Sequence, residues 1–349
     1  MEEWKTYNIC DVCQSISETY RGNAASVVLI NTSDVLDGEF LTHEKVPNKD
    51  LKGQFKKVFH ENDILYSEIR PANKRFAFVG FEPQDYIAST KLMVIRANDK
   101  VLPRFLFHYL KSEKTICELQ TIAESRSGTF PQITFSELGN LEISLPSIET
   151  QKRIAGFLDS IEDKIKLNNR INHNLEEQMV SLFNNLCVEI EDNTEASLTE
   201  IADYINGLAM QKFPAQKGET GLPVLKIKEL GQGFCDESSD RCTGEIKTDS
   251  IIHDGDIVFS WSGTLLVDMW CGGTCGLNQH LFKVQSNKYP KWFYYMWTKH
   301  HLENFIHIAK DKAVTMGHIK RGHLENAIVR VPSADTLDSL DKIFSLNYS

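Results

Sequence analysis

Apolar residues between positions 150 and 188 recur at alternating steps of four and three, the spacing of a helix with one apolar stripe. This segment has no proline, and no glycine after Gly156. The pattern predicts a helix of about 38 residues, on the order of 57 Å long at 1.5 Å per residue. Its seam residues are Ile154, Leu158, Ile161, Ile165, Asn168, Asn172, Leu175, Met179, Leu182 and Leu186.

Two seam positions near the middle of this helix, Asn168 and Asn172, are polar. Polar residues at the seam of paired helices lower stability and define a register or a partner. An apolar stripe of this length must be covered. The sequence leaves two ways open: the helix folds back over a globular domain, or it pairs with a helix of another subunit.

The chain also contains a long internal repeat. An offset of 186 positions relates seven identical residues without a gap: Ala123, Thr129, Ile133, Leu138, Asn140, Pro146 and Ser147 match Ala309, Thr315, Ile319, Leu324, Asn326, Pro332 and Ser333. Upstream the offset rises to 193, which relates Asp63 to Asp256. A period near 190 residues is too long for a solenoid. We therefore predict a duplicated domain, with copies at 1–147 and 194–333 and a spacer helix at 148–190.

The order of predicted elements is the same in both copies. In each copy a strand rich in β-branched residues is followed by a second strand, by one amphipathic helix that begins after a proline, and by a closing strand. The ranges are 64–69, 91–96, 104–119 and 141–145 in the first copy, and 257–261, 281–285, 291–305 and 327–331 in the second. The fold class is α+β: two homologous α/β domains separated by a long coiled-coil-forming helix, with a truncated second helix at 334–349.

Composition narrows the class of protein. With 349 residues, 41% hydrophobic and 25% charged, the chain fits neither a disordered nor a fibrous protein. It has no apolar run long enough to span a membrane and no signal peptide at its start, so we expect a cytoplasmic protein. Cys10 and Cys13 form a CxxC pair, but the sequence has no second pair of Cys or His ligands at zinc-finger spacing. We therefore predict no metal and no cofactor.

One loop and the segment after it resemble a known family. The loop reads Ser127-Gly128-Thr129-Phe130-Pro131-Gln132-Ile133, and the spacer helix opens with Leu145-Pro146-Ser147-Ile148-Glu149-Thr150-Gln151. These resemble the Gly-Thr loop and the start of the conserved helical region in specificity subunits of type I restriction-modification systems. Thr150 stands where that family commonly has Glu, and Met316-Gly317-His318 replaces the Pro-Gln of the loop in the second copy. The resemblance covers essentially the whole chain.

The resemblance implies a target-recognition domain in each copy, each reading one half of a split sequence in double-stranded DNA. It also implies that the helix spaces the domains and docks methyltransferase subunits, in a complex that includes restriction subunits. The short second helix leaves a homodimer through the long helix open. The formal charge of −10 disfavours strong DNA binding by the chain alone, because phosphate affinity comes mostly from Lys and Arg.

Candidate DNA contacts lie in two loops of each copy. Arg can bond guanine and Gln adenine through two hydrogen bonds each, and hydroxyl side chains suit phosphate. The candidates are Arg70, Lys74, Arg75, Arg126, Ser127, Thr129 and Gln132 in the first copy, and Ser262, Lys310, Lys312, His318, Lys320 and Arg321 in the second. The aromatic run 292–297 has helical spacing, which favours a core role over base stacking.

No catalytic motif is present: the sequence lacks NPPY, a phosphate-binding GxxxxGK[ST] and HExxH. We therefore predict a subunit that is not an enzyme and that reads DNA for catalytic partners. Two other hypotheses remain at this point. The chain could serve a related system with a fused nuclease-methyltransferase, or it could be a coiled-coil scaffold whose duplicated domains bind proteins.

Overall fold

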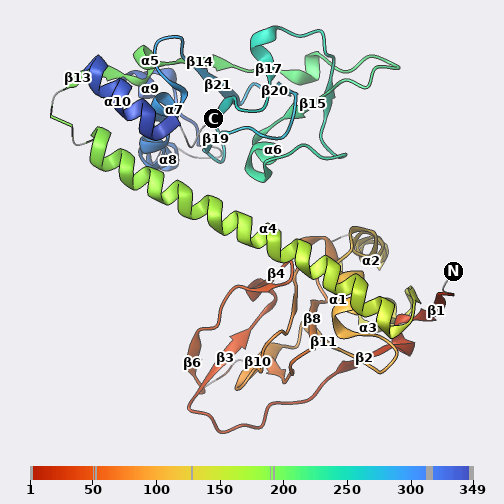
Figure 1. The fold of residues 1–349 in the computed structure, drawn as a ribbon. Helices are drawn as coiled ribbons and strands as arrows, with labels where there is room; N and C mark the ends of the chain where they lie inside the picture. The colour runs from red at the N-terminus through yellow and green to blue at the C-terminus, as the bar shows by residue number, and fades with distance from the viewer. Residues whose placement is uncertain are drawn as a thin grey trace. The chain divides into compact units, whose positions relative to one another are not determined.

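The computed structural model describes residues 3–49, 51, 53–126, 129–188, 190–191, 193–311 and 317–345. The chain divides into two compact units, Met1–Asn169 and Arg170–Ser349, each with its own hydrophobic core. Each unit contains one copy of the sequence repeat (Figure 1). Both mix helices with small sheets, which confirms the α+β class.

Three sheets form the framework of the first unit. The strand orders are β1-β12, β2-β11-β8-β9 and β6-β3-β10-β7, and a short β4-β5 hairpin accompanies them. The bounds are β1 Lys5–Asn8, β2 Cys13–Ile16, β3 Ser26–Ile30, β4 Val35–Leu36, β5 Glu39–Phe40, β6 Lys45–Pro47, β7 Phe55–Lys57, β8 Ile64–Ser67, β9 Phe76–Phe78, β10 Tyr86–Ser89, β11 Leu92–Ala97 and β12 Glu142–Leu145.

The second unit repeats this topology. Its strand orders are β13-β22, β14-β21-β18-β19 and β16-β15-β20-β17. In both units the first strand pairs antiparallel with the last, which joins the two ends of the domain. The bounds are β13 Asn193–Ser197, β14 Asp203–Asn206, β15 Leu222–Leu225, β16 Arg241–Cys242, β17 Ile251–Ile252, β18 Ile257–Ser260, β19 Val267–Met269, β20 Cys275–Leu277, β21 Leu281–Gln285 and β22 Ile328–Pro332.

The prediction of one amphipathic helix in each copy is wrong, because the structure has two helices there. In the first unit α1 (Pro103–Leu110) is followed by α2 (Glu113–Arg126), and in the second α7 (Lys291–His300) by α8 (Leu302–Asp311). The first break has a local cause: the Ser112 hydroxyl accepts the main-chain N–H of Thr115 at 3.3 Å and so caps α2. At the second break the His301 ring bonds the main-chain oxygen of Ile328 at 2.8 Å, which ties this corner to β22.

Short helices complete each unit. They are α3 (Phe135–Gly139) in the first and α5 (Leu198–Ile201), α6 (Ile227–Gln232), α9 (Arg321–Glu325) and α10 (Ala334–Phe344) in the second. Trp292 shows how α10 is held: its ring stacks on Phe344 at 4.4 Å, and its indole nitrogen donates to Asp341 at 2.7 Å. The aromatic residues Trp292–Trp297 are buried, as predicted.

The spacer helix α4 runs from Ile148 to Phe183 without interruption and continues as a π-helical turn at Asn184–Val188 (Figure 1). Its first turns belong to the first unit and its last turns to the second, where Met179 and Phe183 enter the core. None of the described helices is long and apolar enough to cross a membrane.

Candidate nucleic-acid interface

Three chain segments cross at the end of β8 in the first unit. Arg70 donates its main-chain nitrogen to Pro131 at 3.1 Å, and Ile133 donates to Glu68 at 2.8 Å. A bridge between Ile69 and Gln132 lies between these two bonds. The residue before β11 joins from the other side, because Glu68 donates to the main-chain oxygen of Lys91 at 3.0 Å.

The second unit has the same crossing at the end of β18. Gly263 donates to Gly317 at 2.9 Å, and Ile319 donates to Trp261 at 3.0 Å. Here the bridge is between Ser262 and His318, and Trp261 donates to the main-chain oxygen of His280 at 3.4 Å. Every main-chain bond of the first crossing thus has a counterpart in the second. The residues that follow β8 and β18 are related by the offset of 193, the loop residues by the offset of 186, and Lys91 and His280 by an offset of 189.

A side-chain trio from the three segments gathers at each crossing. In the first unit the Lys91 ammonium lies 3.6 Å from the Glu68 carboxylate and 3.3 Å from the Gln132 amide oxygen. In the second unit the Trp261 ring lies 5.8 Å from the His280 ring and 6.5 Å from the His318 ring, measured between centroids. We call these sets the first-copy trio and the second-copy trio.

Four of the six trio residues, Glu68, Lys91, Trp261 and His280, were not predicted as DNA contacts from the sequence. Lys91 and His280 lie outside the two loops of each copy that supplied the candidates, because each immediately precedes a strand, β11 or β21. The repeat alignment could have found them, since Lys91 and His280 occupy equivalent positions next to Glu68 and Trp261. His280 is also held by Ser262, whose hydroxyl lies 3.0 Å from its Nδ1.

Most predicted cations of the first copy already have intramolecular partners. Arg75 donates to the main-chain oxygens of Ser33 and Val35, so its guanidinium holds β4 in place. Lys74 lies 3.2 Å from Glu113, and Arg126, the last residue of α2, pairs with Glu137. The side chain of Arg70 is exposed at the crossing itself, and Thr129 is exposed in the adjoining loop.

The second-copy candidates divide into two groups. Ser262 and His318 face each other across the crossing, and Ser262 is 6% exposed. Lys310, Lys320 and Arg321 are exposed, on the last turn of α8 and at the start of α9. Ser127 and Lys312 lie outside the described residues.

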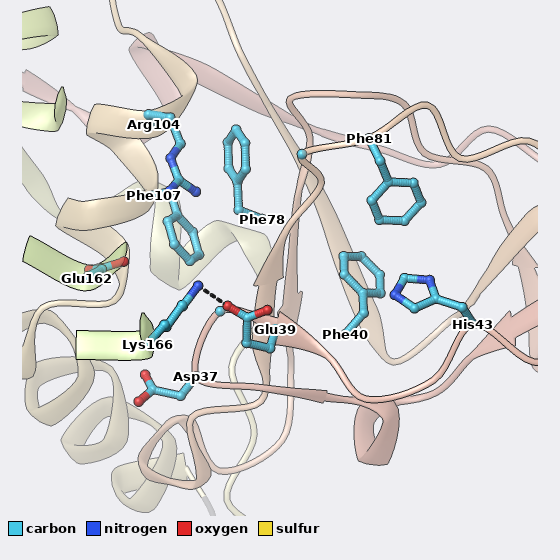
Figure 2. Close-up of a pocket in the computed structure, with 12 residues that line it drawn as sticks. Asp37, Glu39, Phe40, His43, Phe78, Phe81, Arg104, Phe107, Glu162 and Lys166 are labelled. Atoms are coloured by element: carbon cyan, nitrogen blue, oxygen red, sulfur yellow. Dashed lines mark hydrogen bonds and ion pairs between the residues drawn. The ribbon is translucent and has the colours of Figure 1, made fainter. Parts of the chain in front are cut away.

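A group of ionic contacts joins the first unit to α4. Lys166 pairs with Glu39 of the β5 hairpin, and Arg104 of α1 lies 2.6 Å from Asp159. Figure 2 shows Lys166 and Glu39 facing each other beside a cavity of about 260 Å³, with Arg104 on the same side. Arg104 also lies 4.5 Å from the Phe78 ring, a cation–π contact. These contacts fix the first unit on the first half of α4.

His108 is the buried part of this network. Its Nε2 lies 2.8 Å from Asp159, its Nδ1 lies 3.4 Å from Glu162, and its side chain is 6% exposed. One histidine and two carboxylates could hold a metal ion, and this is the one such group among the described residues. Arg104 and Lys111 already neutralise both carboxylates, so the group has the partners of a structural ion-pair network.

Cys13, the buried member of the CxxC pair, is poorly suited to bind a metal. Cys13 is 4% exposed and donates its Sγ hydrogen to the main-chain oxygen of Ile9 at 3.3 Å. Burial, with a smaller effect from Cys10, raises the pKa of the Cys13 thiol to about 12. A thiol held in its protonated form is a poor metal ligand, because metals bind the thiolate.

Comparison with known proteins shows which family this chain resembles. Residues 1–177 match the family described as type I restriction modification DNA specificity domain. The chain belongs to the type I restriction-modification DNA specificity family. Its match covers the first unit, its crossing and most of α4.

Two curated relatives extend the match of this specificity-family chain. It is 46% identical over 234 residues to the type I restriction enzyme HindI specificity subunit of Haemophilus influenzae, covering 66% of this chain and 50% of that protein. It is 23% identical over 327 residues to the MjaIX specificity subunit of Methanocaldococcus jannaschii, covering 85% and 73%. The aligned chain thus spans half the length of the HindI subunit.

A solved structure supports the fold of the whole specificity-family chain. The S subunit of a type I restriction-modification system from M. genitalium superposes with a TM-score of 0.53, 14% sequence identity, and coverage of 99% of this chain and 89% of that one. At this identity the likeness concerns the fold. It applies to both units and α4.

The predicted seam of α4 is exposed in its middle and covered at its ends. Ile161, Ile165 and Leu175 are 42%, 54% and 47% exposed, and Asn168 and Asn172 are exposed between them. Toward the ends, Ile154 packs against the first core, Leu158 is half-buried, Met179 is 8% exposed, and Leu182 and Leu186 pack against the second core. The apolar surface left uncovered is therefore the central three to four turns, about 161–175.

Proposed function

We propose that this chain is a DNA sequence-recognition subunit without catalytic activity of its own. Each unit reads one half of a split target in double-stranded DNA, and methyltransferase and restriction subunits supply the chemistry, in the cytoplasm where the DNA is. One observation carries the proposal: the two units hold the same crossing with the same main-chain hydrogen bonds but present different side chains on it. A common frame with different side chains suits two readers of two different half-sites.

The specificity family and the HindI relative support this function, and they disfavour a protein-binding scaffold. The electrostatics sets its limits. Several predicted cations are paired with acids within the first unit, and the whole chain has a formal charge of −10. Affinity for DNA phosphates should therefore be weak in the chain alone and should rise when partner subunits contribute cations.

The test is methylation of a DNA pool with a randomised segment by the chain co-expressed with a type I methyltransferase subunit. The expected product is methylated within one split motif. Exchanging residues 1–145 for the first domain of another family member should alter one half of that motif and leave the other half unchanged. Methylation without sequence preference, or none with any partner, would contradict the proposal.

The central part of α4 is the surface that we propose for subunit pairing. The exposed seam is self-complementary in an antiparallel arrangement: Asn168 would face Asn172 of a second copy, and Ile165 would face Leu175. Polar residues then meet polar residues and apolar residues meet apolar ones. The two amides can bond each other, which defines the register.

Light scattering after size exclusion tests this pairing in the purified chain. We expect a dimer that Ile165→Glu dissociates, because it places a carboxylate in the apolar seam. Lys164→Glu, which changes the charge by two instead of one at the neighbouring exposed position, should leave the dimer intact. A wild-type chain that stays monomeric at every concentration would contradict the homodimer, and the methyltransferase subunit would then be the expected partner of the seam.

A further inference from the structure

The residues of the two trios occupy equivalent positions in the two units, and main-chain hydrogen bonds hold these positions together. The bonds that close each crossing are main-chain bonds, among them Glu68 to Lys91 and Trp261 to His280. Ile69 and Ser262 continue the frame in each unit. Side chains at these positions can therefore change without loss of the hydrogen bonds that hold the crossing together.

The side chains that occupy them differ completely in chemistry. The first-copy trio combines a carboxylate and an amide that both contact one ammonium. The second-copy trio combines an indole with two imidazoles, and the amide of Gln279 lies 3.3 Å from His280 Nε2. Both trios are built from groups that contact base edges: donors and acceptors in the first unit, and imidazoles beside an apolar ring face in the second.

Both trios can be reached from solvent. The side chain of Lys91 is 50% exposed and that of Glu68 is 23% exposed, whereas Gln132 and His280 are half-buried and His318 is exposed. Partial burial limits the freedom of these side chains and keeps their polar ends available. The Trp261 indole nitrogen is itself buried and has no hydrogen-bond partner among the described residues, so the fold leaves this donor unsatisfied.

We infer that the two trios, Glu68–Lys91–Gln132 and Trp261–His280–His318, are the specificity-determining residues of the two half-sites. The inference rests on the proposed function, and it assigns each half of the target to one trio. The ammonium of Lys91 suits the two acceptors of guanine in the major groove, and the Glu68 carboxylate suits the amino group of the paired cytosine. The second trio reads its half-site through imidazole hydrogen bonds and contact of the Trp261 ring with a thymine methyl group.

The test uses the full chain with its co-expressed methyltransferase subunit and a double-stranded DNA pool with a randomised segment. Bound DNA is recovered and sequenced for the wild type and four variants. Lys91→Met removes the ammonium from the first trio, and Lys5→Met removes one from an exposed lysine of β1, a strand that pairs with β12. His280→Asn alters the second trio. His253→Asn is its matched control, because His253 also bonds a hydroxyl, that of Thr274, through Nδ1.

We expect Lys91→Met to reduce base preference about tenfold at one or two positions of one half-site, and His280→Asn to do so in the other half-site. Both controls should reproduce the wild-type motif. A thermal melt of each variant verifies folding, and if His280→Asn is unfolded, His318→Gln replaces it. A wild-type split motif that Lys91→Met and His280→Asn leave unchanged would overturn the inference alone. A wild type that selects no motif would overturn the proposed function and the inference with it.

Discussion

Arg96 donates two hydrogen bonds of 2.7 Å, from Nε and Nη2, to the carboxylate of Asp63. Asp63 is 1% exposed and also accepts the main-chain N–H of His60 at 2.8 Å. The pair thereby joins the turn before β8 to strand β11, the two elements that lead into the first crossing. The three hydrogen bonds that the Asp63 carboxylate accepts give it a structural role.

Replacing Arg96 with Met should destabilise the first unit by about 2 kcal/mol, because a buried carboxylate loses its charged partner. The loss is smaller than for a fully buried pair, since the Arg96 side chain is 34% exposed and water can replace it in part. Hydrogen–deuterium exchange in urea, followed on peptides of each unit, measures this. Lys283→Met removes the corresponding partner of Asp256, which is 25% exposed, and should cost less. Equal losses in the two units would contradict the argument.

The contact between α1 and α4 should weaken in acid. Burial raises the pKa of Asp159, but the hydrogen bonds from Arg104 and His108 lower it more, and the net shift is downward. A carboxylate with a lowered pKa in the folded state stabilises the protein above its unfolded pKa, about 3.9, and this stabilisation is lost as the pH falls through the folded value.

We therefore expect Asp159→Asn to lower the melting temperature of the first unit at pH 7. The gap between wild type and variant should close as the pH falls below 4. Melts at a series of pH values measure this, with Asp163→Asn as the control, because Asp163 is exposed on the same helix. A gap that persists unchanged to pH 2 would show that the charge of Asp159 is not what holds α4.

Acid should begin to destabilise the second unit at a higher pH than the first unit. Burial lowers the pKa of His301, and the nearby His300 lowers it further, against an upward effect from the bond to Ile328. A histidine whose pKa is lowered by folding stays neutral in the folded protein. Between its folded and unfolded pKa values, the unfolded chain therefore binds more protons. Stability is then complete above the unfolded pKa, about 6.5, and falls as the pH drops below it.

His301→Gln tests this, because its amide can still donate to the main-chain oxygen of Ile328 without titrating. We expect the melting temperature of the second unit to fall between pH 7 and pH 5 in the wild type and to fall less in the variant. His307→Gln, an exposed histidine of α8, should keep the wild-type profile. Parallel profiles for all three proteins would place the titrating group elsewhere.

Much of this architecture could be predicted from sequence because its signals are periodic. The apolar spacing revealed α4, and identities at fixed offsets revealed the duplicated domain. The helix breaks at Ser112 and His301 escaped prediction because they arise from a side-chain cap and from a contact with a strand far along the chain. Periodicity carries no information on either.

The candidate site was harder to predict for a related reason. Loop cations such as Arg75 were chosen for their charge, yet the structure shows Arg75 bonding two main-chain oxygens of its own domain. Lys91 and His280 were not predicted because they lie outside the two loops of each copy that supplied the candidates. Only the crossing of three distant segments brings them beside Glu68 and Trp261.

Arg70 is held in a conformation that glycine would adopt more easily. Its φ of +43° lies in the left-handed region, and the equivalent residue of the second crossing is Gly263, with φ +66°. Both donate their main-chain nitrogen to the loop that passes beside them. A left-handed conformation costs an ordinary residue about 1–2 kcal/mol, part of which glycine gives back through the greater freedom of its unfolded chain.

Arg70→Gly should therefore stabilise the first unit by up to about 1 kcal/mol, whereas Gly263→Ala should destabilise the second by a similar amount. Strain of this kind persists where a side chain is needed at that position. We expect Arg70→Gly to weaken DNA binding by the complex with the methyltransferase subunit, and to make that binding less sensitive to salt by about one phosphate contact. Melts and binding titrations at several salt concentrations measure both effects. An Arg70→Gly protein that is more stable and binds DNA as tightly as the wild type would show that the strained conformation has no part in recognition.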